Sequence, residues 1–334
     1  MNAGATHPAG GERRGIRVLV TSAYPDEQPI SLFRTMMPLD RFGVHTVTDD
    51  PGAADLILFV ENSHYEDDPF FGALRRHPLV RRYPEKAFMY NEHDRPYCPL
   101  PGVYASMPRR WFDPSRQRAG GYIKTQNPYI ETLAREQTPD LLFSFSGRRT
   151  AEVRSRILDL RHPGALLWDT GSYDAYVVVN QGAEPMKYAE ILGRSRFVIC
   201  PRGIGTSTQR LFETIRAGRV PVILSDEWVE PHGPRWERFS LRVPESAVHL
   251  IPGLVEEHDA RWSEMSREAR AAWDEWFADD VKFHRIVEHC RDIERSRTRP
   301  EAQAQRIPRP FPLYARNRVR SLARRVAKRL GSKR

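Results

Sequence analysis

Long hydrophobic runs and closely spaced cysteines are both missing from this sequence. No apolar stretch approaches the ~20 residues that a helix needs to span a bilayer. Residues 1–15 contain no apolar segment of the kind found in secretory signals, and we expect them to form a disordered leader. The three cysteines, Cys98, Cys200 and Cys290, lie too far apart for a zinc site or a disulfide framework. These absences favour a globular protein of the cytoplasm.

An excess of basic residues is present only at the end of the chain. The net charge is +9, but residues 315–334 (ARNRVRSLARRVAKRLGSKR) hold nine basic residues and no acidic one. The remainder is formally neutral, which argues against nucleic-acid binding. We call residues 301–334 the tail. If its end, residues 315–334, is helical, the larger apolar side chains there fall on one face and arginines fill the remaining face; these apolar side chains are Val319, Leu322, Val326 and Leu330. A basic amphipathic helix of this kind suits an anionic membrane surface; the alternative is a terminal helix that docks on the first domain.

Short apolar runs that end in polar loops recur along the chain and predict an α/β fold with parallel sheets. The expected strands are 17–21, 44–48, 55–60, 87–90, 141–145, 165–168, 196–200 and 220–224, with 241–244 and 248–251 as short strands or turns. The expected helices are 68–76, 151–160, 185–193, 207–217, 253–259, 262–278 and 280–297. We expect the proline-rich segment 96–122 to be irregular. This rhythm predicts two Rossmann-like domains, 16–136 and 137–300.

A glycine-rich loop, CPRGIGTSTQRLFE from Cys200 to Glu213, lies between a predicted strand and a predicted helix. Gly203 and Gly205 allow a tight turn and a close approach to a ligand. The following helix would present free N–H groups and the positive end of its dipole. Arg202 and Arg210 add charge suited to phosphate oxygens. We interpret the loop as a nucleoside diphosphate site; the alternative is that Arg210 and Glu213 form a surface ion pair at i, i+3.

The run FVICPRGIGTSTQRLFETIRAGRVPVILSDEWVEP resembles the signature of the exostosin family of glycosyltransferases. The segment FSLRVPE, residues 239–245, is similar to the next part of that signature. The resemblance implies a GT-B architecture, with two Rossmann-like domains that face each other across a cleft. It also implies inverting transfer of a sugar from a UDP-sugar to the hydroxyl of a glycan acceptor.

Carried onto this chain, the resemblance implies a set of residues that bind the donor. Arg202, Gly203 and Gly205 would cradle the diphosphate, together with Ser207 at the start of the helix. Arg210 would neutralise the leaving phosphate, Glu213 would hold the ribose, and Asp226 would face the donor sugar or nucleotide. A second set of donors follows an earlier strand and consists of Gly147, Arg148 and Arg149. For these two arginines, a solvated helix start is the alternative.

Inverting transfer requires a general base, which we expect the first domain to supply across the cleft. The candidates follow the ends of predicted strands and are Glu61, His64, Glu66, Glu92, His93 and Asp94. Asp94 is our first choice because Arg95 could orient it and keep it ionised; Glu92 and His64 come next. The alternative is that Asp94 and Arg95 only form an ion pair within a loop.

No Asp-x-Asp motif occurs in the chain, so we expect no metal ion and no cofactor beyond the nucleotide-sugar donor. The predicted protein is thus a cytoplasmic enzyme, peripheral on the inner face of a membrane, that acts in surface polysaccharide assembly. Other interpretations remain open. The chain could be a catalytically silent glycan- or nucleotide-binding module, a membrane-assembly protein dominated by its tail, or a nucleotide-sugar epimerase.

Overall fold

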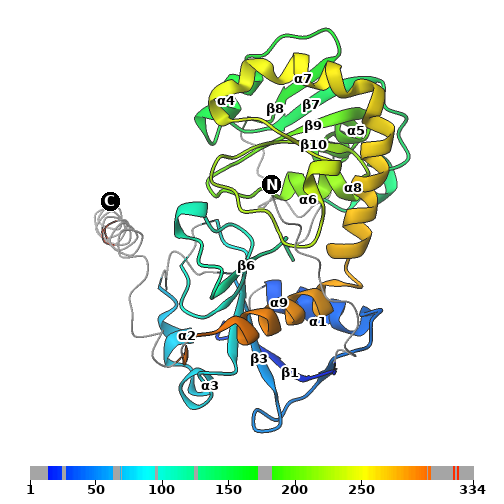
Figure 1. The fold of residues 1–334 in the computed structure, drawn as a ribbon. Coiled ribbons are helices and arrows are strands. Elements are labelled where there is room, and N and C mark those ends of the chain that lie inside the picture. Colours follow the sequence, from blue (N-terminus) through cyan, green and yellow to red (C-terminus); the bar gives the residue numbers. More distant parts are fainter. Residues whose placement is uncertain are drawn as a thin grey trace, which may run out of the picture.

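The computed structural model describes residues 14–24, 28–62, 68, 70–94, 97–123, 127–171, 183–298, 300–301, 319 and 322. They form two parallel sheets (Figure 1). The first sheet has the order β2-β1-β3-β4-β5-β6 and contains β1 (Arg17–Thr21), β2 (Thr46–Val47), β3 (Leu56–Glu61), β4 (Ala87–Asn91), β5 (Gly102–Tyr104) and β6 (Gln117–Ala119). The second has the order β11-β10-β9-β7-β8 and contains β7 (Leu141–Gly147), β8 (Ala165–Asp169), β9 (Ser195–Pro201), β10 (Val220–Leu224) and β11 (Leu241–Arg242). The α/β fold class with two Rossmann-like domains is confirmed.

Helices cover both sheets, so the central strands are buried on both faces. All six residues of β3 and all five of β10 are buried, as expected of central strands in parallel sheets. The first sheet carries α1 (Gln28–Met36), α2 (Gly72–Arg76) and α3 (Pro78–Arg82). The second sheet carries five helices that follow β7 in the chain. They are α4 (Glu152–Leu158), α5 (Ala183–Gly193), α6 (Gln209–Arg216), α7 (Ile251–His258) and α8 (Trp262–Trp276).

The helix α9 (Lys282–Ser296) returns to the first sheet. Its residues Phe283, Val287 and Cys290 are buried in one hydrophobic core with Val18 of β1 and Phe33 of α1. In Figure 1, α9 lies beside α1 and across the strands of the first sheet. Residues 282–296, which we placed in the second domain by their position in the chain, therefore pack with the first. The other predicted domain boundaries stay predictions.

Two local predictions were wrong. The segment 96–122, expected to be irregular, contains β5 and β6, each of which extends the first sheet by three parallel residues. The segment 248–251, expected as a strand or turn, continues the 3₁₀ helix Glu245–Leu250 into α7. Pro201 is the last residue of β9 and pairs with Leu224; at this position its missing N–H leaves the middle of the strand intact.

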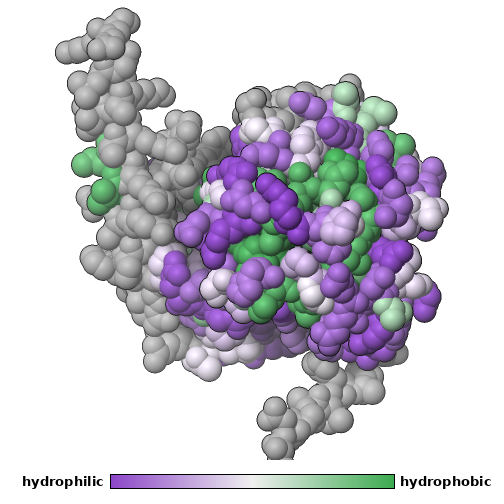
Figure 2. Space-filling model, turned by 90° about the horizontal axis from the view of Figure 1, so that it is seen from above, coloured by the Kyte–Doolittle hydropathy of each residue, from purple (hydrophilic) through white to green (hydrophobic). Residues whose placement is uncertain are grey.

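The strand β8 forms one edge of the second sheet, and an open groove runs between it and α5. Its apolar lining includes Leu166, Leu167, Met186 and Ile191. Figure 2 views the molecule from above and shows hydrophobic side chains in a hollow among hydrophilic ones.

Most of the predicted tail lies outside the described residues. Val319 and Leu322 are the described positions of the predicted apolar stripe, and both are helical and exposed, at 69% and 64%. The predicted leader lies outside the described residues except for residues 14 and 15. Among the helices of the described part of the chain, none is long and apolar enough to cross a membrane.

Candidate functional site

The glycine-rich loop connects the carboxyl end of β9 to α6, at the edge of the second sheet that faces the first domain. Two hydrogen bonds hold it against β10: the N–H of Arg202 donates to the carbonyl of Leu224 at 2.9 Å, and the hydroxyl of Ser225 donates to the carbonyl of Thr206 at 2.8 Å. Thr208 precedes α6 in an extended conformation and makes no side-chain cap. The first N–H groups of α6 therefore lie at the carboxyl edge, where open α/β sheets bind ligands.

Arg210 is buried and only partly satisfied. Its Nη2 donates to the carbonyl of Ser146, and its guanidinium lies 4.7 Å from the centre of the Phe145 ring. Its Nε and Nη1 are buried without a hydrogen-bond partner among the described residues, as are Thr206 Oγ1 and Ser207 Oγ. Buried polar groups in proteins are nearly always paired, and these four groups are all hydrogen-bond donors of a kind that suits an anion.

The alternative interpretation of Arg210 and Glu213 as a surface ion pair is wrong. Both side chains are buried, and no ion pair joins them in the described structure. The two oxygens of Glu213 are engaged by other groups: Oε1 accepts from the N–H of Asn127 at 3.0 Å, and Oε2 accepts from the hydroxyl of Tyr188 at 2.7 Å. Burial, and after it the charge of Glu213, raises the pKa of Tyr188 well above its usual value. The role of Glu213 toward a ribose stays a prediction.

Gly147 and Arg149, predicted as a second set of donors, have different environments. A Cβ added to Gly147 would lie 2.7 Å from Nη2 of Arg210, so the glycine leaves room for the buried guanidinium. Arg149 is exposed and pairs with Asp169 at 2.9 Å, at the end of β8. This pairing matches the alternative of a solvated helix start. Arg148, between them, is half-buried.

Arg202, Asp226 and Glu245 form one network. Arg202 Nε lies 2.8 Å from Glu245 Oε1, and the N–H of Glu245 donates to Asp226 Oδ1 at 3.0 Å. Arg202 is therefore charge-paired within the protein, while Arg210 is not. Asp226 is exposed and fixes the start of the segment that carries Glu245. The sequence places Glu245 at the end of a motif and gives no sign of its contact with Arg202, because the two residues are 43 positions apart.

Arg154 of α4 also supports the loop and was missed. Its Nε donates to the carbonyl of Arg202 at 2.9 Å, and Nη2 donates to the carbonyl of Pro201 at 3.4 Å. A Cβ added to Gly203 would lie 3.0 Å from the same guanidinium. The sequence gives no signal for this contact, because one arginine on a predicted helix does not show which way it points.

The first-domain candidates for the base differ in their contacts. Glu61 is fully buried and accepts from Ser22 Oγ at 2.7 Å and from the N–H of Ala23 at 2.8 Å. Glu92 is buried and accepts from the N–H of Ile123 at 2.8 Å. These carboxylates hold loops at the carboxyl edge of the first sheet. His93 is half-buried, and its N–H donates to Asn91 Oδ1. His64, Glu66 and Arg95 lie outside the described residues.

Asp94 is the candidate that reaches the glycine-rich loop. A Cβ added to Gly205 would lie 2.6 Å from Asp94 Oδ1 and would overlap Ser106 Oγ. The hydroxyl of Tyr122 lies 3.5 Å from Asp94 Oδ1. The structure therefore brings together our first choice of base and the predicted diphosphate loop, across the boundary between the domains. Its catalytic role stays a prediction.

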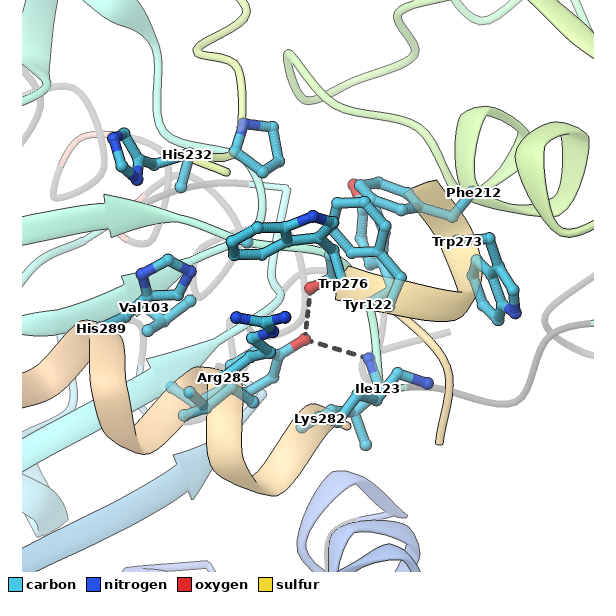
Figure 3. A pocket seen from close by; sticks show the side chains of 17 residues that line it. Val103, Tyr122, Ile123, Phe212, His232, Trp273, Trp276, Lys282, Arg285 and His289 are labelled. Carbon is cyan, nitrogen blue, oxygen red and sulfur yellow. Dashed lines mark hydrogen bonds between the residues drawn. The ribbon is translucent and has the colours of Figure 1, made fainter. Parts of the chain in front are cut away.

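A small cavity lies behind this contact, between α8, α9 and the loop after β6 (Figure 3). It offers about 40 Å³ to water-sized molecules, which is room for a few waters and not for a sugar nucleotide. Tyr122, Phe212 and Trp276 form aromatic walls, and Arg285 and His289 project from α9 (Figure 3). Burial lowers the pKa of His289 to about 3, and the neighbouring cations add to this effect.

Within the described residues, no three His, Cys, Asp or Glu side chains lie close enough together to hold a metal ion. The independence from metal ions that the missing Asp-x-Asp motif predicts stays a prediction.

Part of the chain is similar to known proteins. Residues 119–258 match the Exostosin GT47 domain. The "Probable glycosyltransferase" of Arabidopsis thaliana is 33% identical over 112 residues, which cover 33% of this chain and 22% of that protein. The Exostosin-1 homolog of Caenorhabditis elegans is 33% identical over 98 residues, covering 28% of this chain and 26% of that protein. The chain thus spans about a quarter of the length of these relatives.

Solved structures show a similar general layout. A glycosyltransferase from Rickettsia africae is 8% identical and has a TM-score of 0.44, covering 84% of this chain and 99% of its own. An alpha1,3-fucosyltransferase is 13% identical and has a TM-score of 0.42, covering 86% of this chain and 92% of its own. The sequence match contains the glycine-rich loop. Residues 119–258 of this chain are thus similar to the exostosin family of glycosyltransferases.

Proposed function

We propose that the protein is an inverting glycosyltransferase that transfers a sugar from a nucleotide-sugar, most simply a UDP-sugar, to a hydroxyl of a glycan acceptor. One observation carries the proposal: Arg210 is buried with two nitrogen atoms that have no partner among the described residues, and the same holds for the hydroxyls of Thr206 and Ser207 just before α6. The likeness of residues 119–258 to the exostosin domain alone would leave open whether this chain keeps a donor site.

The unpaired donors fit a diphosphate. A buried guanidinium without a carboxylate partner is costly unless an anion binds to it, and the N–H groups of Nε and Nη1 can each donate to an anionic oxygen. The start of α6 adds N–H groups and the positive end of the helix dipole. When the bond between the sugar and the diphosphate breaks, negative charge grows on the leaving oxygen. Preorganised donors at that place lower the barrier because they need no rearrangement.

The first domain supplies the other half of the reaction. In the proposed step, the Asp94 carboxylate takes the proton of the acceptor hydroxyl, whose oxygen forms a bond to the anomeric carbon of the donor sugar. The bond from that carbon to the diphosphate oxygen breaks, and the nucleoside diphosphate leaves with the electron pair. Attack from the face opposite the leaving group inverts the anomeric centre. The contact of Asp94 with the loop at Gly205 supports this assignment.

A donor panel tests the proposal. Thermal unfolding is measured with UDP, GDP and ADP and with their common sugar derivatives, and nucleoside diphosphate release is followed with each sugar nucleotide. We expect one nucleotide series to raise the unfolding temperature, and Arg210→Met to abolish that rise. If no nucleotide stabilises the wild-type protein, the proposal is wrong. Stabilisation without release or transfer, with a range of glycan acceptors, would instead identify a silent nucleotide-binding module.

We further propose that the basic tail brings the enzyme to the inner face of a membrane, where lipid-linked acceptors for surface polysaccharides are assembled. Exposed Val319 and Leu322 on the predicted stripe support this placement. Sedimentation with vesicles tests it: the full chain should bind vesicles that contain phosphatidylglycerol and not pure phosphatidylcholine, and removal of residues 315–334 should abolish binding. Equal binding by the shortened chain would contradict the role of the tail.

A further inference from the structure

A serine of the first domain is bound to the glycine-rich loop of the second. Ser106 follows β5, and only 2% of its surface is exposed. Its Oγ accepts two hydrogen bonds, from the N–H of Thr206 at 3.0 Å and from the N–H of Ser207 at 3.2 Å. One hydroxyl oxygen thus occupies two successive backbone donors of the loop, 100 residues away in the sequence.

Gly205 makes this contact possible. A Cβ at that position would overlap Ser106 Oγ and would lie 2.6 Å from Asp94 Oδ1. The two first-domain side chains therefore converge over one residue of the loop, and only a residue without a side chain leaves room for both. Tyr122 supports the same contact from the first domain. Its ring packs edge-on against Phe212 of α6 (Figure 3), and its hydroxyl lies 3.5 Å from Asp94 Oδ1.

Two roles for Ser106 are compatible with these hydrogen bonds. Its oxygen could fill the place of a phosphate oxygen and be displaced by the donor, or it could hold the loop permanently while the donor binds elsewhere. The unpaired groups favour the second role. Thr206 Oγ1, Ser207 Oγ and two nitrogens of Arg210 remain available while Ser106 holds the amides. A diphosphate can bind these side chains without competing for the N–H groups of Thr206 and Ser207.

We propose that Ser106 is a positioning residue that docks the first domain on the glycine-rich loop and thereby holds the Asp94 carboxylate over Gly205. The inference rests on the proposed function for its effect on transfer, but the docking contact itself can be measured without any substrate. Ser106 touches no reacting atom in this scheme. It acts by fixing the distance between the domain that supplies the base and the loop that binds the donor, and catalysis is sensitive to such distances.

Hydrogen exchange tests the contact in the ligand-free full chain. In Ser106→Ala, the amides of Thr206 and Ser207 lose their acceptor, and we expect their exchange to accelerate at least about fivefold, the change for one lost hydrogen bond. Ser263→Ala, on the exposed surface of α8, is the control and should leave these amides unchanged. Unchanged exchange in Ser106→Ala would overturn the proposal, whatever the protein's activity.

Kinetics then separate positioning from donor binding. We expect Ser106→Ala to lower kcat for transfer at least about tenfold, while the Kd of UDP changes less than about twofold; Ser106→Thr, which keeps the hydroxyl, should recover most of kcat. Ser207→Ala, on the other side of the same contact, should instead weaken UDP binding. Tighter UDP binding in Ser106→Ala would show that its oxygen occupies a phosphate position and would overturn the positioning role, as would an unchanged kcat.

Substitution of the glycine tests the same contact from the second domain. Gly205→Ala should accelerate exchange at Thr206 and Ser207 as Ser106→Ala does, because the new methyl group separates the domains at this point. Gly253→Ala is the matched control, since a Cβ there meets no atom within 4 Å. If the wild-type protein binds no UDP, the proposed function fails, while the exchange results still decide whether Ser106 holds the loop. Exchange in Gly205→Ala equal to that of Gly253→Ala would count against the contact.

Discussion

The hydroxyl of Tyr188 donates a 2.7 Å hydrogen bond to the carboxylate of Glu213, and this bond joins α5 to α6 behind the glycine-rich loop. Glu213 is 7% exposed and also accepts a hydrogen bond from the N–H of Asn127. A buried carboxylate with few donors depends strongly on each of them. Tyr188 and Asn127 therefore hold the Glu213 side chain in place.

We expect Tyr188→Phe to lower the free energy of unfolding by about 1–3 kcal/mol, because it leaves a buried carboxylate with one fewer donor. Urea unfolding measures the change. Tyr129→Phe is the control, since the Tyr129 hydroxyl makes no hydrogen bond within the described residues and its ring packs in the same core. Equal losses in the two variants would mean that the hydrogen bond to Glu213 contributes nothing.

Arg210→Met should separate stability from donor binding. The buried guanidinium makes one hydrogen bond, to Ser146, and has two unpaired nitrogens, so an apolar side chain of similar length should cost less than about 1 kcal/mol or even stabilise the fold. UDP affinity should fall at least about tenfold, since the charged hydrogen bonds to phosphate are lost. Calorimetric titration and thermal unfolding give the two values. Strong destabilisation with normal UDP affinity would assign Arg210 to the core and not to the donor site.

Asp94 and Glu92 should behave differently when each is replaced by alanine. Asp94→Ala should spare UDP binding and lower transfer at least about a hundredfold, the usual effect of losing a general base. Glu92→Ala should lower the free energy of unfolding by about 1–3 kcal/mol, because the buried N–H of Ile123 loses one of its two acceptors and the Tyr90 hydroxyl loses its contact with the carboxylate. Transfer assays and urea unfolding on both variants test the assignment. Full transfer by Asp94→Ala would move the search for the base to His64.

We expect the free energy of unfolding to decrease as the pH is lowered, because of His289. Its pKa is lowered to about 3 in the folded protein from an ordinary value of 6.5, so the unfolded chain takes up a proton that the folded protein excludes. The contribution of the neutral imidazole is complete above pH 6.5 and is lost progressively as the pH falls toward 3. We expect His289→Gln to flatten the decline between pH 6.5 and 4.5, compared with the wild type and with exposed His249→Gln. Parallel unfolding curves for all three proteins would contradict the shift.

The alternation of apolar runs and polar loops predicted the sheets well. Runs such as residues 17–21 and 220–224 coincide with β1 and β10, because strands buried on both faces must be continuously apolar. The strands β5 and β6 escaped prediction. Each has three residues in a proline-rich segment, and neither has enough local pattern to indicate a strand. They exist because the edge of β4 offers unpaired backbone groups to any segment that returns there.

The sequence predicted which short segments contribute to the candidate site, but not the hydrogen bonds between segments that are far apart in the chain. Glycines and arginines in one short run identified the loop, since helix starts that bind phosphate need both. Contacts between segments far apart in the chain, such as Ser106 with Thr206 and Arg154 with Arg202, have no trace in spacing or composition. The same is true of the unpaired nitrogens of Arg210, because burial of one side chain depends on everything packed around it.

The return of α9 to the first sheet has a consequence for synthesis on the ribosome. The first domain lacks part of its core until Phe283, Val287 and Cys290 have been made, whereas the second sheet and its covering helices are complete by the end of α8. The usual order, in which an N-terminal domain folds first, is therefore reversed. The second domain can close its core while the first domain still lacks its last helix.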